Sequence, residues 1–169
     1  MPHGSLGDCL DSERWAGELV IAAYRSFSAL DRADRRLVLE AAVLMAFAWT
    51  GLRLLRFATL RRALDRFAGP PACAKSRQTH AALIGRVGWA ITATAARFPA
   101  ANCLVQALAA VTILRSRGVA CELRIGVRAG DNGAGPIEAH AWVDCGGAVA
   151  VGAVDDLTEF KMLAALRPQ

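Results

Sequence analysis

The period of the apolar residues changes near residue 118, and this change constrains the fold more than any other feature. Before it, apolar side chains recur every three to four residues, as in helices; after it, they alternate with polar ones, as in strands. Three segments alternate, 120–128, 137–145 and 148–154, and Gly146-Gly147 is a typical two-residue hairpin turn. The sequence therefore predicts an α+β fold, with a helical N-terminal half and then a central helix packed on a small antiparallel sheet.

Four helical segments are expected before the sheet: from about residue 13, from Asp31 or Asp34 to Phe67 with a break near Gly51, over 79–98 and over 102–117. Gly69-Pro70-Pro71 ends the second of them, and Gly118 is a suitable cap for the last. We expect a flexible tail over 1–12, a helical region over 13–69 and a catalytic core over 70–169, the last two forming one compact unit.

Composition excludes several classes of protein. With 169 residues, 54% of them hydrophobic, the chain is long enough for one domain with a sizeable core. The net charge is +5, but there is one tyrosine and no Lys/Arg run interleaved with aromatic residues, so we expect no nucleic-acid partner. The apolar run 41–52 is shorter than the roughly 18 to 20 residues that span a bilayer. A buried helix is predicted there, with peripheral membrane contact as the alternative.

The cysteines indicate the compartment. There are five of them, so one stays unpaired in any disulfide scheme, and none forms a CxxC pair. The first residues include acids and lack an apolar signal core. We therefore expect a reduced, cytoplasmic protein. Cys73 and Cys121 have no acid or base as a partner in the pattern and are interpreted as structural, and Cys145, beside the predicted turn, is at most an exposed thiol.

Cys103 stands at the start of the predicted helix 102–117. A thiol attacks as its thiolate, and the unpaired N–H groups and positive dipole end of a helix start favour that anion and can hold an oxyanion. A lone cysteine in a helix is also often a small core residue. From its position alone, Cys103 is thus either a nucleophile or a buried apolar side chain.

A nucleophilic thiol needs an imidazole within hydrogen-bond reach. Of the three histidines, only His140 lies inside a predicted strand, and alternation places it on the polar face together with Trp142. An active-site cleft would explain both side chains. Trp142 is then either an aromatic residue that lines the substrate site or a packing residue.

In such enzymes an acidic side chain usually accepts a hydrogen bond from the second ring nitrogen of the catalytic histidine. If Gly146-Gly147 makes the turn, His140 opposes Ala153 across the hairpin, and its diagonal neighbour on the same face is Asp155. Asp156 takes that place if a bulge shifts the register by one residue. The competing interpretation is a zinc site, whose ligands would be Cys103, Cys121, His140 and Cys145, but it lacks the close ligand pairs typical of zinc.

Two segments together resemble a known family. "NCLVQALAAVTILRSRGVACELRIGV" and "EAHAWVD", with the glycine hairpin after them, are similar to the leader peptidase (B protein) of lasso-peptide biosynthesis, a family of transglutaminase-like (papain-like) cysteine proteases. The similarity covers about residues 30–160 and includes "ADRRLVLEAAVLMAFAWTGLRLLRF" and Phe98-Pro99. It implies that Cys103 is the nucleophile and His140 the general base and acid.

The resemblance has one departure. Family members with a clear third catalytic residue carry an aspartate twelve positions after the histidine, and here that position is Gly152. Either Asp155 serves instead, or the enzyme works with a Cys-His dyad.

The resemblance also implies a reaction and partners. The substrate would be a ribosomal precursor peptide, cut between leader and core, after which a separate lasso cyclase closes the ring. About 30 residues precede the matching region, too few for a leader-recognition domain, so a separate recognition protein is expected. No cofactor or metal is expected. The alternatives are a transglutaminase-like acyltransferase and a non-catalytic scaffold that binds precursor or cyclase through residues 41–60.

Overall fold

The computed structural model describes residues 27–69, 77–129 and 136–166. Leu37–Gln169 form one compact unit, and the residues before Leu37 belong to another. The predicted tail over 1–12 and the predicted short helix from residue 13 lie outside the described residues. All candidate site residues belong to the unit that begins at Leu37.

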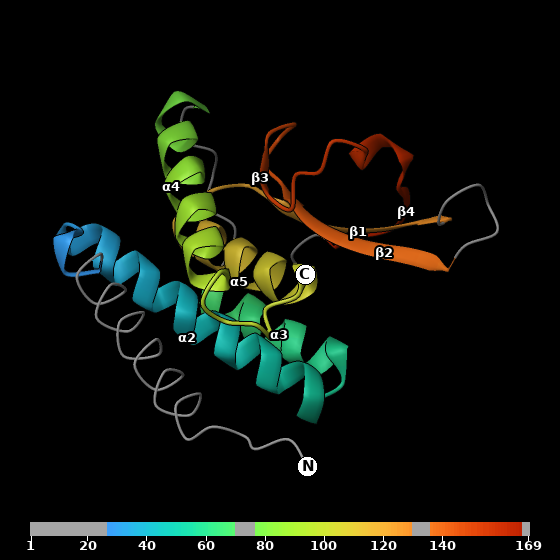
Figure 1. Ribbon diagram of the computed structural model, residues 1–169, viewed down its shortest axis with the longest axis horizontal. Coiled ribbons are helices and arrows are strands. Elements are labelled where there is room, and N and C mark those ends of the chain that lie inside the picture. Colours follow the sequence, from blue (N-terminus) through green and yellow to red (C-terminus); the bar gives the residue numbers. More distant parts are fainter. Residues whose placement is uncertain (1–26, 70–76, 130–135, 167–169) are drawn as a thin grey trace, which may run out of the picture. The chain divides into compact units, whose positions relative to one another are not determined.

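The four longest helices of the described ranges lie where the apolar period predicts them: α2 (Arg32–Leu54), α3 (Phe57–Ala68), α4 (Arg77–Ala95) and α5 (Cys103–Ser116) (Figure 1). The expected break near Gly51 lies a few residues later, between α2 and α3. Gly51 itself is a contact position, because a Cβ there would lie 2.5 Å from the Cδ1 atom of Leu60. The missing side chain lets α3 pack closely on α2.

The described strands form one antiparallel sheet in the order β3-β2-β1-β4: β1 (Glu122–Ala129), β2 (Ile137–Asp144), β3 (Val149–Val151) and β4 (Lys161–Leu166). The first three are the predicted ones. A 3-10 helix is present at Leu157–Glu159, and the strand β4 that follows it was not expected. "KMLAAL" does not alternate strictly, and its partner is β1, far earlier in the chain. The local pattern therefore does not predict this strand.

A bulge changes the register of the β2–β3 hairpin. The observed pairs are Asp144↔Val149 and Val143↔Val151. The first is the pairing that a Gly146-Gly147 turn predicts, whereas the second is shifted by one residue, so Ala150 is the extra residue of the bulge. β3 then ends, and the ladder does not extend as far as His140. The continuous register used to select Asp155 is therefore not the observed one.

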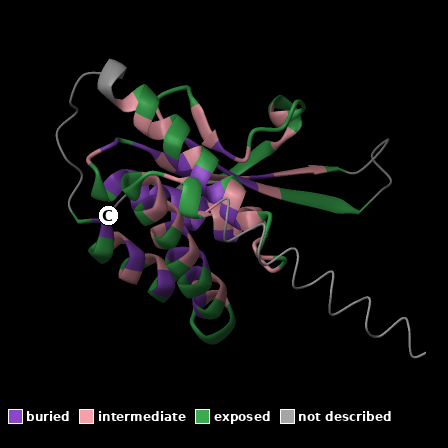
Figure 2. Cartoon of the chain, turned by 60° about the vertical axis from the view of Figure 1, so that its left-hand side comes forward, coloured by how far each residue is buried: buried purple, intermediate pink, exposed green. Residues whose placement is uncertain are grey.

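α5 is the central helix of the compact unit. Ten of its fourteen residues are buried, so it is covered on every side, as an apolar helix without a polar face requires. It packs against α3, α4 and the β1–β2–β3 side of the sheet (Figure 1). Figure 2 shows buried residues on the inner sides of the helices and strands and exposed residues on their outer sides. This packing fixes the start of α5 relative to the sheet.

α2 has two sides. One side carries core residues, among them Ala41, Met45 and Ala48, none of which is exposed at all. The other exposes large apolar side chains, including Val43 and Phe47. With 23 residues, α2 is long and apolar enough to cross a membrane by length and composition, a test that core helices and signal sequences also pass. One third of its most apolar window is buried.

Candidate active site

Cys103 is the first residue of α5, as predicted, and its side chain is half-buried. The helix begins there because Asn102 caps it: the Asn102 Oδ1 atom accepts a hydrogen bond of 3.0 Å from the Val105 N–H group. The N–H groups of Cys103 and Leu104 lie in the first turn, where a helix supplies no acceptor. The thiol thus stands beside N–H groups for which the helix supplies no acceptor, at the positive end of the helix dipole.

His140 lies in the middle of β2 and is half-buried. Its Nε2 atom lies 2.8 Å from the carbonyl oxygen of Gly152. Two aromatic rings hold the imidazole: Trp142 is stacked on it at 6.2 Å between centroids, and Phe160 packs at 5.4 Å. The ring orientation of His140 is therefore set by one hydrogen bond and two ring contacts.

The structure brings α5 and β2 together as packed elements. No hydrogen bond joins the Cys103 thiol to His140 within the described part of the chain. Catalytic hydrogen bonds are often long in ligand-free enzymes and tighten only with substrate. The pairing of Cys103 with His140 stays a prediction from the sequence and the resemblance.

Asp155 is exposed and lies in the turn after β3. No side-chain hydrogen bond or ion pair of Asp155 is found among the described residues. The neighbouring Asp156, the alternative under a shifted register, lies 3.3 Å from Arg128 and lines a cavity together with His140. No hydrogen bond or ion pair among the described residues therefore supports the role predicted for Asp155, which stays a prediction.

Trp142 is 4% exposed. Its ring covers Gly126 on β1: a Cβ at Gly126 would lie 3.1 Å from the Cη2 and Cζ3 atoms of Trp142 and 3.0 Å from the Cβ atom of Phe160. Gly126 pairs directly with His140 in the β1–β2 ladder. Of the two roles that the sequence left open, the structure gives Trp142 the packing role, and a contact with substrate stays a prediction.

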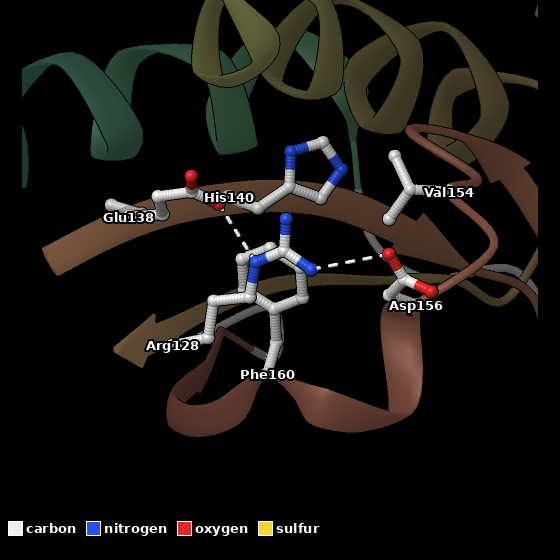
Figure 3. A pocket seen from close by; sticks show the side chains of 7 residues that line it. Arg128, Glu138, His140, Val154, Asp156 and Phe160 are labelled. Carbon is white, nitrogen blue, oxygen red and sulfur yellow. Dashed lines mark hydrogen bonds and ion pairs between the residues drawn. The ribbon is translucent and has the colours of Figure 1, made fainter. Parts of the chain in front are cut away.

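A cavity of about 350 Å³ adjoins His140 (Figure 3). Its lining includes Arg128, Glu138, Asp156 and Phe160. Arg128 lies over the Phe160 ring, and its hydrogen bonds to Glu138 and then Asp156 raise the pKa of the Arg128 guanidinium. Sequence reasoning missed Arg128 and Phe160. The available signal for Arg128 was alternation along 120–128, which puts it on the polar face of its strand; the observed Gly126↔His140 pairing then places it on the face of His140.

Cys121 and Cys145 flank the Glu122↔Asp144 pair of the β1–β2 ladder. A hydrogen bond from Cys145 lowers the pKa of the Cys121 thiol, and the same hydrogen bond, with burial, raises the pKa of Cys145. Within the described ranges, no three His, Cys, Asp or Glu side chains are placed to hold a metal ion. The zinc arrangement considered from the sequence therefore has no geometric support in that part of the chain.

The arrangement of a helix-start cysteine, a strand histidine and a small antiparallel sheet can be compared with known families. A model described as the transglutaminase-like superfamily matches residues 42–165. The chain belongs to the transglutaminase-like superfamily. The match covers α5, the sheet and most of α2, so the predicted α+β transglutaminase-like fold is confirmed. Members of the superfamily are usually enzymes, either cysteine proteases or transglutaminases.

The match identifies the superfamily of the chain and no particular family within it. Neither the curated proteins nor the solved structures that were compared with the chain gave a match. The superfamily fits thiol-dependent acyl transfer, to water or to an amine, and leaves the substrate open.

Proposed function

We propose that this transglutaminase-like protein is a cysteine peptidase that removes the leader peptide from a ribosomally made lasso-peptide precursor. The observation that carries the proposal is the half-buried Cys103 at the capped start of the central helix, in a chain of this superfamily. The sequence resemblance to lasso leader peptidases supplies the substrate class. His140, with its orientation set by Gly152, Trp142 and Phe160, is the proposed base.

The proposed reaction is acyl transfer in two steps. His140 takes the proton of the Cys103 thiol, and the thiolate attacks the carbonyl carbon of the last leader residue. The N–H groups at the start of α5 stabilise the oxyanion. The peptide C–N bond then breaks, His140 protonates the released amine of the core peptide, and a thioester remains on Cys103. Water attacks the thioester, releases the leader as a carboxylic acid and restores the thiol.

The proposal includes partners and a compartment. The precursor peptide is the substrate, a separate leader-recognition protein presents it, and a separate lasso cyclase uses the product. The reaction takes place in the cytoplasm, where a thiol stays reduced. It needs no cofactor and no nucleic acid.

An apolar groove on α2 and α3 is the surface that we propose for the recognition protein. Leu39, Val43, Phe47 and Phe67 line this α2–α3 groove and are 46 to 67% exposed, and the cavity measures about 470 Å³. Arg62 and Arg66 are exposed on α3 beside it. A groove of this kind fits an amphipathic segment whose apolar side chains enter it and whose acidic residues meet these arginines.

The test is cleavage of a candidate precursor by the purified protein together with its recognition protein, followed by mass spectrometry. Cys103→Ala should abolish cleavage. Cys145→Ala removes another half-buried thiol and is the matched control, which should retain activity. Undiminished cleavage by Cys103→Ala would contradict the proposed mechanism.

The same experiment separates the two alternatives. With an added primary amine, a product whose leader carries that amine in place of a carboxylate would indicate a transglutaminase-like acyltransferase. Unchanged precursor maturation with Cys103→Ala in the producing cell would indicate a non-catalytic scaffold.

A further inference from the structure

We propose that the main-chain carbonyl of Gly152 is the group that orients the His140 imidazole, in the place where a carboxylate stands in relatives with a full triad. This inference rests on the proposed function, because it assigns a positioning role in that reaction. Its first basis is the 2.8 Å contact between His140 Nε2 and the Gly152 oxygen.

The contact determines which imidazole nitrogen carries the proton. A carbonyl oxygen can only accept a hydrogen bond, so Nε2 must be the donor. In the neutral ring, Nδ1 is then left without a proton and can accept one from a thiol. Trp142 and Phe160 pack against the ring and restrict its rotation about the side-chain bonds. Gly152 thus selects the tautomer that a general base requires and, with the two aromatic rings, holds the imidazole in one orientation.

The backbone at this position admits only glycine. Gly152 has a φ of +82°, in the left-handed region. A Cβ there would lie 2.7 Å from the Ala141 carbonyl oxygen and 3.0 Å from the Trp142 Cα atom, both of them main-chain atoms that cannot move aside. A side-chain carboxylate is therefore excluded at the position where the resemblance places the third residue. The same close approach brings the carbonyl to the imidazole.

The carboxylates nearby are directed elsewhere. Asp156 and Glu159 each lie 3.3 Å from Arg128, and Glu138 lies 2.7 Å from it. Asp155 is exposed, with no side-chain hydrogen bond or ion pair to the described residues. Among the described residues, the acceptor found for His140 Nε2 is thus a main-chain carbonyl.

The bulge explains how the carbonyl reaches His140. The extra residue Ala150 shifts the register, and β3 ends at Val151. Gly152 is then the first residue outside the ladder, so its carbonyl is free to turn toward the side chain of β2 instead of bonding a neighbouring strand.

The first test needs no activity. In protein labelled with 15N-histidine, the His140 signals, assigned by their loss in His140→Gln, should show the proton on Nε2. With 13C-carbonyl glycine added, a scalar coupling should join Nε2 to the Gly152 carbonyl carbon. A neutral His140 with its proton on Nδ1, or a wild-type protein without this coupling, would overturn the proposal. This measurement on the wild type decides the matter even if a variant at Gly152 does not fold.

The second test uses variants. Gly152→Ala should lose the Nε2–H preference and lower precursor cleavage by roughly tenfold to 100-fold, within what general acid–base catalysis contributes. Gly147→Ala is the matched control: its φ is +98°, but a Cβ there meets no atom within 4 Å, so it introduces the backbone strain without the clash. Gly147→Ala should keep the tautomer and the activity.

Asp155→Asn decides whether the Gly152 carbonyl or the Asp155 carboxylate orients His140. It should leave the His140 tautomer and the cleavage rate unchanged within about twofold. An effect as large as that of Gly152→Ala would overturn the carbonyl assignment and favour the carboxylate. If the spectra support Gly152 but wild-type protein does not cleave the precursor, the positioning inference holds and the proposed substrate is wrong.

Discussion

At the scale of single residues, three cysteines of the described chain have three different environments. Cys103 is half-buried at a helix start, Cys121 is 6% exposed, and Cys145 is half-buried beside the β2–β3 turn. The hydrogen bond between Cys121 and Cys145, with burial, keeps the pKa of Cys145 far above its ordinary value, so this thiol stays protonated. Only the thiolate is nucleophilic. The three thiols should therefore differ in reactivity.

We predict that iodoacetamide at neutral pH modifies Cys103 before Cys121 and Cys145. Cys121 should react at least about tenfold more slowly because it is buried, and Cys145 more slowly because it retains its proton. Mass mapping of peptides over a time course measures the three rates, and protein unfolded in urea, in which all three should react alike, is the control. A Cys103 as protected as Cys121 would argue against its role as nucleophile.

At the scale of elements, a buried ion pair joins α3 to the end of α5. Arg115 is 7% exposed; it lies 2.9 Å from Asp65 and donates two further hydrogen bonds to the Cys121 carbonyl. The pair of Arg117 with Glu40 on α2 is shorter, at 2.6 Å, but its side chains are about 30% exposed. The difference in exposure predicts different contributions to stability.

Asp65→Ala should lower the free energy of unfolding by about 2 to 3 kcal/mol, because it leaves a buried guanidinium without its carboxylate. Glu40→Ala should cost less than about 1 kcal/mol, as exposed pairs do. Urea denaturation of both variants gives the comparison. Equal losses would mean that burial of Arg115 does not set the strength of its pair.

Two glycines on α4 give a second comparison between elements. A Cβ at Gly88 would lie 2.5 Å from the Ala150 carbonyl oxygen, so Gly88 is where α4 meets β3. Gly85, one turn earlier, is exposed, and a Cβ there meets no atom within 4 Å. Gly88→Ala should destabilise the protein by about 1 to 3 kcal/mol through overpacking. Gly85→Ala should stabilise it by up to about 1 kcal/mol, because alanine favours the helix. Thermal unfolding measures both, and a stabilising Gly88→Ala would contradict the close approach of α4 to β3.

The elements also show what sequence can predict. The helices α2 to α5 and the strands β1 to β3 follow from the apolar period and from the glycine and proline positions that end the segments. β4 does not, because its strand character comes from pairing with β1 and not from its own alternation. Cys103 and His140 could be identified from the sequence, because their residue types and their positions in the predicted helix and strand indicate them. The Gly152 carbonyl could not, because its position depends on a bulge and on a backbone angle that residue types alone do not encode.

At the scale of the whole molecule, the α2–α3 groove is the exposed apolar feature for which we propose a partner. Val43→Glu and Phe67→Glu should leave stability nearly unchanged, because these side chains are 67% and 66% exposed. Each should weaken binding of the recognition protein by roughly tenfold or more, since a carboxylate then occupies the apolar contact. Calorimetric titration measures the affinity.

Ile137→Glu is the matched control for the groove variants, because Ile137 is 77% exposed on β2, outside the groove. It should bind the recognition protein as the wild type does. If the groove variants also bind normally but float less with anionic vesicles, the groove contacts a membrane instead of the recognition protein.

The bulge between β2 and β3 has a consequence for how this site tolerates change. Every amino acid has the same main-chain carbonyl, so substitution by alanine does not remove it. Alanine scanning of the polar side chains around His140 would therefore find no third catalytic residue and would indicate a Cys-His dyad. The acceptor depends instead on the number of residues between His140 and Gly152, which fixes the path of the chain. A one-residue insertion or deletion in this hairpin would remove the acceptor while every candidate side chain remained in place.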